Sequence, residues 1–542
     1  MHHKLSALLL IIASTLSLHA VDISGTINYE RIHPLHSGSS TILDTNNITT
    51  ETAKQIVVEA ISSSGTAIAS TTTNDNGQYL LTNLPSDTNV KIRAYAKMLK
   101  SSGWDVKVID NTNNNAQYIL EGDLITTGSS DSSRTLKASA STKSSPPFAI
   151  LDSVYLAMKK VLLADSSVIF PPLKMNWSVN NIESGTYYDG NDNIMIQGDQ
   201  QGDSDEYDDH IMIHEWGHYF EAKFSRADSI GGSHGSGDHL DIRLAFGEGW
   251  GNALSAMVTD DPFYFDTIGT SGWNMNIETA QHNTPGWFSE ASIQRILYDL
   301  YDSNDDGSDT LSLGFKPIYD LLTSKQKKTE AFTSLFSFIT ELKNENSSHS
   351  GQIDGITENE NIATINDIYG SNRLNTVNIE NLPIYSKLTI NKTLTNICTS
   401  TTYGVVNKLS NHKLIRFTVN ENKSYPIKVI QTNGRTSDPD FTLFQTSPFK
   451  QIALSEKPTL AKEEATYTLP KGNYLLNIYD ARDSTKACFN ISIGEQSTIP
   501  TEPTTSSNSV GIELPKNPLL TLLLFLGISI LPVLFIRKEL KI

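Results

Sequence analysis

The distribution of apolar residues along the chain separates two kinds of segment. Near the start and late in the chain, apolar and polar residues alternate, as in KQIVVEA at 54–60 and ATYTLPKGNYLLNIYDA at 465–481. Alternation with a period of two predicts half-buried β-strands. In the middle, residues 148–163 and 293–301 carry apolar residues at helical spacing. The pattern therefore predicts β-rich segments on either side of a mixed, partly helical region.

Longer apolar runs mark both ends of the chain. The first run follows a lysine and ends before Ala20, so residues 1–20 are expected to be a secretory signal peptide, with an uncleaved anchor as the alternative. Residues 518–536 carry no charge and are long enough for one bilayer crossing, and the basic tail 537–542 follows. The positive-inside rule then leaves the tail in the cytoplasm and the rest exported to the cell envelope or surface. A sorting signal removed during surface attachment is the alternative to a permanent anchor.

Five further segments lie between these ends. We expect a β-sandwich at 21–125, a Ser- and Thr-rich linker at 126–145, a mixed domain at 146–380, a second β-sandwich at 381–495 and a Ser/Thr/Pro-rich tether at 496–517. A chain of 542 residues has room for several domains, and its 38% hydrophobic residues suffice for real cores. The expected fold class is multidomain, with β-sandwich domains on either side of the mixed domain and a C-terminal transmembrane helix.

Charge and cysteine content narrow the classes of function. Lys and Arg number 42 against 60 Asp and Glu, and the net charge of -18 argues against nucleic acid as a partner, which would need a basic surface. Two cysteines, Cys398 and Cys488, are too few for a disulfide-dense scaffold or a Cys-rich zinc finger. Both fall in the second predicted β-sandwich. In an exported chain we expect them to form one disulfide, and two buried free thiols are the alternative.

The candidate chemistry centres on the sequence HEWGH, which begins at His214. On a helix, His214 and His218 lie one turn apart on one face, so both imidazoles can reach a single metal ion. Glu215 lies about 100° further round the helix, where it can accept a proton from metal-bound water. Zinc needs a third protein ligand. A glycine three positions and a histidine six positions after the second histidine would supply it, but Glu221 and Phe224 occupy those positions.

A glutamate on a following helix is the other source of a third ligand. Residues 244–258, LAFGEGWGNALSAMV, place Glu248 and Asn252 on one face of a predicted helix. The three glycines of this segment each cost about 1 kcal/mol of helix stability, so we expect another element to approach closely there. Glu248 is the expected third ligand, and a solvated helix carboxylate is the alternative.

HEWGH followed by GEGWGN resembles the fungalysin branch of the thermolysin-like (gluzincin) zinc endopeptidases, whose signature is HEYxH followed by GEGWxD. The resemblance implies an α+β thermolysin-like catalytic domain in which His214, His218 and Glu248 bind zinc and Glu215 is the general base. Asn252 stands where the family has an aspartate that hydrogen-bonds a zinc histidine. An amide still orients the ring, but it raises the basicity of the ligand less.

The same resemblance implies a catalytic histidine that steadies the oxyanion, in an HxxxG segment before a helix. His282 fits that order, while His234 and His239 are rivals for the role, and the ordinary interpretation of each is a surface-loop histidine. Residues 186–198 have the place of the edge strand on which this family lays its substrate. The simpler interpretation is a strand that only precedes the catalytic helix.

Two acidic segments are candidates for calcium. The first offers oxygen ligands at alternate positions beside a turn glycine, as in the first half of an EF-hand loop: Asp302, Asn304, Asp306 and Asp309. No glutamate closes the loop at Leu313, and a polar turn after a helix is the preferred interpretation. Residues 203–209, DSDEYDD, just before HEWGH, are the second candidate. Calcium often stabilises thermolysin-like enzymes, and the resemblance therefore favours both.

The flanking segments resemble accessory domains of secreted proteins. TTTNDNGQYLLTNLP at 71–85 resembles the carboxypeptidase-regulatory-like β-sandwich, and the strands at 385–494 resemble the pre-peptidase C-terminal β-sandwich. The sequence therefore predicts a secreted, membrane-tethered zinc endopeptidase that acts on proteins or peptides. A surface adhesin that keeps a metallopeptidase fold without turnover is the alternative, favoured by the two β-sandwiches and Asn252. A structural envelope protein with an accidental HEWGH is the third hypothesis.

Overall fold

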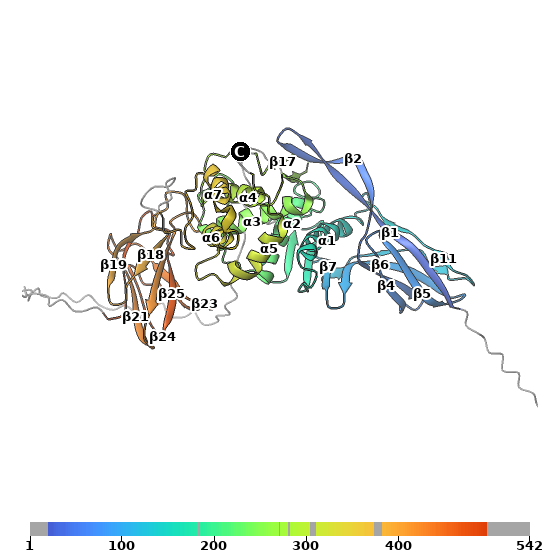
Figure 1. The fold of residues 1–542 in the computed structure, drawn as a ribbon. Helices are drawn as coiled ribbons and strands as arrows, with labels where there is room; N and C mark the ends of the chain where they lie inside the picture. Colours follow the sequence, from blue (N-terminus) through green and yellow to red (C-terminus); the bar gives the residue numbers. More distant parts are fainter. Residues whose placement is uncertain are drawn as a thin grey trace, which may run out of the picture. The chain divides into compact units, whose positions relative to one another are not determined.

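The computed structural model describes residues 20–182, 185–269, 271–279, 282–303, 310–372 and 382–495 (Figure 1). The chain forms two compact units. The first comprises residues 1–216 and 265–275, and the second comprises residues 217–264 and 276–542. The boundary between them falls inside helix α2 (Asp209–Phe224), which is continuous and therefore belongs to both units.

Four of the segments expected at the chain ends lie outside the described residues. They are the signal peptide 1–20, of which only Ala20 is described, the tether 496–517, the apolar span 518–536 and the tail 537–542. Within the described residues, no helix is both long and apolar enough to cross a membrane.

A five-stranded sheet in the first unit is centred on the long strand β1 (Ala20–Ser37). Its neighbours are β2 (Ser40–Thr52) and β5 (Gln78–Pro85), both antiparallel, and β11 (Ser132–Ser133) and β12 (Leu136–Ala138), both parallel. Ile23, Ile27 and Tyr29 alternate along β1 and are fully buried. The alternation of the sequence therefore predicts the buried face of this strand.

The first unit also contains a ten-stranded sheet. Its main path runs β14 (Tyr187–Tyr188), β15 (Asn193–Ile196), β13 (Leu173–Trp177), β7 (Trp104–Asp110), β6 (Asn89–Lys100), β3 (Ile56–Ser62) and β4 (Ala67–Thr72). The short strands β8 (Ala116–Gln117), β9 (Ile119–Glu121) and β10 (Ile125–Thr126) pair with β6 or β7. Helix α1 (Pro146–Ala164) contributes a nearly continuous buried face, from Phe148 to Val161, to the same unit.

This sheet joins two segments that the sequence places in separate domains. Strands β3, β4, β6 and β7 come from the expected first β-sandwich, and β13 to β15 come from the expected mixed domain, yet β7 and β13 pair in parallel. The expected linker 126–145 contains β11 and β12, which pair with β1. Alternation predicts that a segment is a strand but says nothing of its partner. The described chain is multidomain, with many β-sheets and β-rich parts on either side of its helices.

Most of the helices lie in the second unit. They are α3 (Ile242–Thr259), α4 (Glu290–Asp299), α5 (Phe315–Leu321), α6 (Leu335–Glu345) and α7 (Ser350–Asn359). A hairpin of β16 (Phe263–Ile268) and β17 (Ser271–Asn276) follows α3 in the sequence, and its residues 265–275 belong to the first unit. Helix α3 begins after Asp241, whose side chain accepts a hydrogen bond from the Arg243 N–H. This cap satisfies one of the free N–H groups at the start of the helix.

The C-terminal part of the second unit is a sandwich of two antiparallel-rich sheets. One sheet has the order β18 (Tyr385–Leu388), β20 (His412–Val419), β25 (Gly472–Asp480), β22 (Pro439–Thr446) and β23 (Phe449–Ser455). The other has the order β19 (Thr393–Cys398), β26 (Cys488–Ile493), β21 (Lys423–Gln431) and β24 (Lys462–Leu469). Apolar side chains of both sheets, among them Phe417, Ile427 and Phe441, form one buried core.

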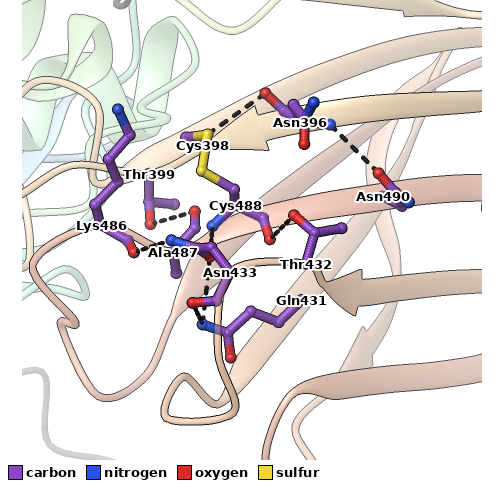
Figure 2. The surroundings of a disulfide bond; sticks show 10 residues. All are labelled: Asn396, Cys398, Thr399, Gln431, Thr432, Asn433, Lys486, Ala487, Cys488 and Asn490. Atoms are coloured by element: carbon purple, nitrogen blue, oxygen red, sulfur yellow. Dashed lines mark hydrogen bonds between the residues drawn. A yellow bond between two sulfur atoms is a disulfide. The ribbon is translucent and has the colours of Figure 1, made fainter.

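The expected disulfide is confirmed. Cys398 and Cys488 lie opposite each other on β19 and β26 and are bonded through their sulfurs (Figure 2). The Cys488 N–H also donates to the side-chain oxygen of Asn433 at 2.7 Å. The bond closes a loop with a sequence separation of 90 residues, and closing a loop of that length stabilises the fold by about 4 kcal/mol.

The expected close approach at the glycines of α3 is confirmed at Gly249. A Cβ placed on Gly249 would lie 2.6 Å from the Ile293 Cβ and 3.0 Å from the Glu290 carbonyl oxygen, both on α4. Neither atom is the end of a flexible side chain, so one of the two helices would have to shift. Glycine is therefore required here by the packing of α3 on α4, although it weakens the helix itself.

Replacing Gly249 by alanine should destabilise the protein by about 2 kcal/mol, because overpacking outweighs the gain in helix propensity. Gly355 of α7 is the matched control, since a Cβ there meets nothing within 4 Å. Gly355→Ala should leave stability unchanged or raise it by up to about 1 kcal/mol. Denaturant unfolding followed by circular dichroism measures both changes. Equal effects of the two substitutions would contradict the packing explanation.

Candidate metal centre

Helix α2 carries the HEWGH residues and is buried almost all round. Its apolar residues Ile211, Ile213 and Trp216 are fully buried, and so are Tyr219 and Phe220 in the next turn. A helix that is buried on every side has few surfaces for polar groups. His214 and Glu215 are nevertheless buried on it, and His218 is half-buried, so these side chains must meet polar partners.

The second half of α2 packs tightly against α3. A Cβ on Gly217 would lie 3.3 Å from the Gly251 Cα, and the Trp250 indole N–H donates to the Gly217 carbonyl oxygen at 3.2 Å. The rings of Phe220 and Trp250 also contact each other, with centroids 5.6 Å apart. This approach brings Glu248 of α3 to His218 of α2, with 3.4 Å between the carboxylate Oε2 and the imidazole Nε2.

The structure brings the three expected zinc ligands together. His214, His218 and Glu248 each offer one ligand atom, and these atoms lie within 4.8 Å of one another. Two imidazoles and one carboxylate form the donor set of an open catalytic zinc site, which keeps a fourth position for water. Tetrahedral bonds of about 2.0–2.1 Å place neighbouring ligand atoms about 3.3 Å apart, close to the separation of His218 and Glu248. The residues present therefore fit zinc.

Glu215 is held by the edge of the ten-stranded sheet. Its Oε2 accepts a hydrogen bond from the Tyr188 backbone N–H of β14 at 2.9 Å, and its Oε1 lies 4.0 Å from the Nε2 of His214. Among the strands of the described residues, β14 pairs with β15 alone and is the end strand of the main path. The Tyr188 N–H thus holds the Oε2 of Glu215, while the Oε1 faces His214. The segment 186–198, expected to be one edge strand, forms two antiparallel strands, β14 and β15, and only β14 lies at the end of the main path.

His234 lies beside the third ligand, although the sequence offered it only as a rival to His282. Its Nε2 is 3.2 Å from the Oε2 of Glu248, and its Nδ1 is 2.7 Å from the Oε2 of Glu290. The loop that carries it is fixed by the side-chain amide of Asn407, which donates to the Gly231 and Ser233 carbonyl oxygens. The sequence signal was weak because a loop histidine has no periodic pattern to mark its partners.

His282 and His239 have other surroundings. The Nε2 of His282 lies 2.9 Å from the Oε2 of Glu360. This oxygen also accepts a hydrogen bond from the Ser292 hydroxyl, and the Oε1 of Glu360 accepts one from Arg295. The His239 ring stacks on Phe288 and on Tyr403, with centroids 4.4 and 4.1 Å away. The metal-binding group found among the described residues includes neither histidine. The oxyanion role of His282 stays a prediction.

Two further carboxyl or amide groups lie close to these helices. Glu221, one turn after His218, is buried, and burial raises its pKa to about 8, with the neighbouring His218 opposing the shift. This carboxyl is therefore expected to carry a proton at neutral pH. Asn252 lies one turn after Glu248 on α3, and its amide donates to the side-chain oxygen of Gln294 on α4 at 2.8 Å.

The two calcium candidates differ in how much of them the structure describes. Asp302 is half-buried after α4, while Asn304, Asp306 and Asp309 lie outside the described residues. In the second candidate, 203–209, the structure places Asp203 and Asp205 together with Asp266 of β16.

One protein-family model matches the chain, the Mycolysin C-terminal domain, over residues 169–353. That range contains β13 to β15, α2 and α3. No curated protein matches the chain. Among solved structures, the pre-peptidase C-terminal domain of collagenase from Bacillus anthracis is 16% identical, with 20% of this chain and 93% of that chain covered and a TM-score of 0.17. PliG from Aeromonas hydrophila, a periplasmic inhibitor of g-type lysozyme, is 14% identical, with coverages of 20% and 96% and a TM-score of 0.14.

The family match covers the part of the chain that carries the candidate metal ligands. The assignment to the fungalysin branch stays a prediction. The match supports a metallopeptidase-associated architecture for this chain.

Proposed function

We propose that this protein is an exported zinc endopeptidase, tethered to the membrane by its C-terminal segment. The observation that carries the proposal is the group of His214, His218 and Glu248, whose ligand atoms lie within 4.8 Å of one another. Mycolysin is a zinc metallopeptidase family, and the match to its C-terminal domain supports the same chemistry. Export and tethering rest on the apolar segments at the two ends of the sequence.

Bound by these three ligands, zinc would supply Lewis acidity toward the substrate carbonyl and water. The residues of the chain supply the rest. Glu215 takes the proton of the attacking water on its carboxylate and returns it to the leaving amine. The Tyr188 N–H, 2.9 Å from Glu215 Oε2, holds that carboxylate in place during both transfers. We expect an extended peptide substrate to lie beside β14, the end strand of the main path of its sheet.

His234 acts as a positioning residue for the third ligand. Because it has a carboxylate oxygen of Glu290 at Nδ1 and one of Glu248 at Nε2, its ring is held from both sides. Polar partners behind a metal ligand fix its orientation, and their loss typically weakens metal affinity 10–100-fold. Glu290 is itself buried, with 6% of its surface exposed, so the ring has little freedom to turn away.

A binding protein without turnover is the second candidate. Asn252 favours this candidate, because the family that the sequence resembles has a carboxylate at this position. The Asn252 amide donates to Gln294. Such a protein would bind zinc normally and cleave nothing.

Glu215→Gln should lower the rate of casein or peptide hydrolysis by about 10²–10⁴-fold, because the general base is lost. Zinc content should stay at about one per chain, since Glu215 is not a ligand. Glu345→Gln on α6 is the matched control, an exposed glutamate paired with Lys325, and it should keep full activity. Proteolysis by the Glu215→Gln protein at the normal rate would sink the mechanism. A zinc-loaded wild-type protein that cleaves no member of a diverse peptide library would favour the binding protein.

His234→Ala should weaken zinc binding by about 10–100-fold, measured by competition with a chromogenic chelator. His234→Gln should recover part of that affinity, because its amide can still donate to Glu248. His282→Ala is the contrasting variant. If His282 steadies the oxyanion, kcat should fall by about 10²–10³-fold with zinc affinity unchanged. Unchanged zinc affinity in His234→Ala would show that His234 does not position Glu248.

A further inference from the structure

The loop that carries His234 is bound by the C-terminal sandwich. Residues 231–241 are the last part of the connection from α2 to α3, and residues 399–411 connect β19 to β20 of the sandwich. Both segments belong to the second unit. A β-bridge joins them at Leu240 and Lys408. The loop beside the third zinc ligand is therefore paired with a segment that comes much later in the chain.

Backbone hydrogen bonds on both sides of this bridge extend the pairing. The Asp241 N–H donates to the Asn407 carbonyl oxygen at 2.9 Å, and the Leu409 N–H donates to the His239 carbonyl oxygen at 2.8 Å. Asp241 is also the residue that caps α3. The sandwich segment thus contacts the chain directly before the helix that carries the third zinc ligand.

The side chain of Asn407 reaches further along the loop than its backbone does. Its amide donates to the Gly231 carbonyl oxygen at 2.8 Å and to the Ser233 carbonyl oxygen at 3.1 Å. Ser233 stands directly before His234 in the sequence. Asn407 is only 2% exposed, so its amide depends on these protein acceptors. One side chain therefore holds the loop at two points just ahead of the histidine.

The loop has the backbone shape that this contact needs. Gly232 has a φ of +98°, in the left-handed region that favours glycine, and a Cβ there would lie 2.7 Å from the side-chain nitrogen of Asn407. A larger residue would therefore displace the amide. Lys408 adds a second contact, because its Nζ donates to the Ser233 carbonyl oxygen and lies 3.1 Å from a carboxylate oxygen of Asp238.

The sandwich segment is itself held in one conformation directly before Asn407. Val406 has a φ of +70°, which is rare for a β-branched residue and persists only where neighbouring groups fix it. Its N–H donates to the side chain of Asp483 at 3.3 Å, and its carbonyl oxygen accepts from the Nε2 of His412 at 3.1 Å. The amide of Asn407 is thus presented to the loop from a fixed backbone.

We propose that Asn407 is a positioning residue of the metal centre, which makes the C-terminal sandwich a part of that centre. Its amide fixes the carbonyl groups on either side of Gly232, and this keeps the Nε2 of His234 at 3.2 Å from the Oε2 of Glu248. The inference rests on the proposed zinc site. It adds that a chain whose sandwich is removed or displaced binds zinc more weakly, although every zinc ligand is still present.

Asn407→Ala in the full-length chain should weaken zinc binding by about tenfold, because groups that orient a metal ligand typically contribute 10–100-fold. Competition with a chromogenic chelator measures the affinity. Asn433→Ala is the matched control, since Asn433 is also a sandwich amide that donates to a backbone carbonyl oxygen, that of Lys486 (Figure 2). Its zinc affinity should equal that of the wild type, even if its Tm falls. If Asn407→Ala fails to fold, Gly232→Ala displaces the same amide from the loop side and takes its place.

A double-mutant cycle separates positioning from a general loosening of the fold. If Asn407 acts through His234, the chain with both His234→Ala and Asn407→Ala should bind zinc no more weakly than His234→Ala alone. Additive losses of affinity would show that Asn407 acts by another route, and would overturn the assignment. Unchanged zinc affinity in Asn407→Ala would overturn it as well.

Hydrogen exchange of the metal-free protein gives a readout that needs no zinc. Peptides that cover residues 229–241 should exchange faster in Asn407→Ala than in the wild type, and at the wild-type rate in Asn433→Ala. Equal exchange in Asn407→Ala and the wild type would overturn the proposal whether or not the chain binds zinc. A wild-type chain that binds no zinc, but whose loop exchanges faster in Asn407→Ala, would overturn the peptidase proposal and leave the fixing of the loop by Asn407 supported.

Discussion

The close approach of α2 and α3 at Gly217 and Gly251 is the constraint on which the metal centre depends. A Cβ placed on Gly217 would lie 3.3 Å from the Gly251 Cα, so a larger residue at Gly217 would press on the facing helix. At this separation the Trp250 indole donates to the Gly217 carbonyl oxygen, and the Glu248 carboxylate lies 3.4 Å from His218. The glycines lower the intrinsic stability of the helices, but they allow the close packing that places Glu248 beside His218. Gly249 does the same on the side that packs against α4.

Buried or half-buried polar groups follow one another along and around α2. A carboxylate cluster precedes the helix, the two histidines and Glu215 follow on it, and Glu248, His234 and Glu290 form a chain of contacts beyond His218. The buried members of this set lose most of their contact with water on folding and must find a charge or a donor within the protein. Such a series leaves α2 little freedom to change its register or its direction.

Sequence reasoning succeeded where the geometry is local. A spacing of four residues on one helix places His214 and His218 on the same face. The glycines around Glu248 predict that another element packs closely against this helix. The pairing of Cys398 with Cys488 followed from their number and from the expectation of export. Sequence reasoning failed where the partners of a residue or strand are distant in sequence. Nothing local to β7 shows that it pairs with β13, and nothing around His234 or Asp266 shows which carboxylates they will meet, because those contacts are set by the packing of whole elements.

The pairing of β7 with β13 has a consequence for a chain that is cut between the N-terminal strands and the rest of the first unit. Strand β7 lies inside the sheet, bonded to β6 on one side and to β13 on the other. A host or bacterial protease that nicked the chain at 126–145 would cut one covalent link and leave these hydrogen bonds and the buried face of α1 intact. The two fragments would remain associated as a nicked complex, since separation would expose an apolar sheet edge to water. By this pairing the N-terminal strands are built into the first unit, unlike a propeptide that forms its own sheet and can dissociate after cleavage.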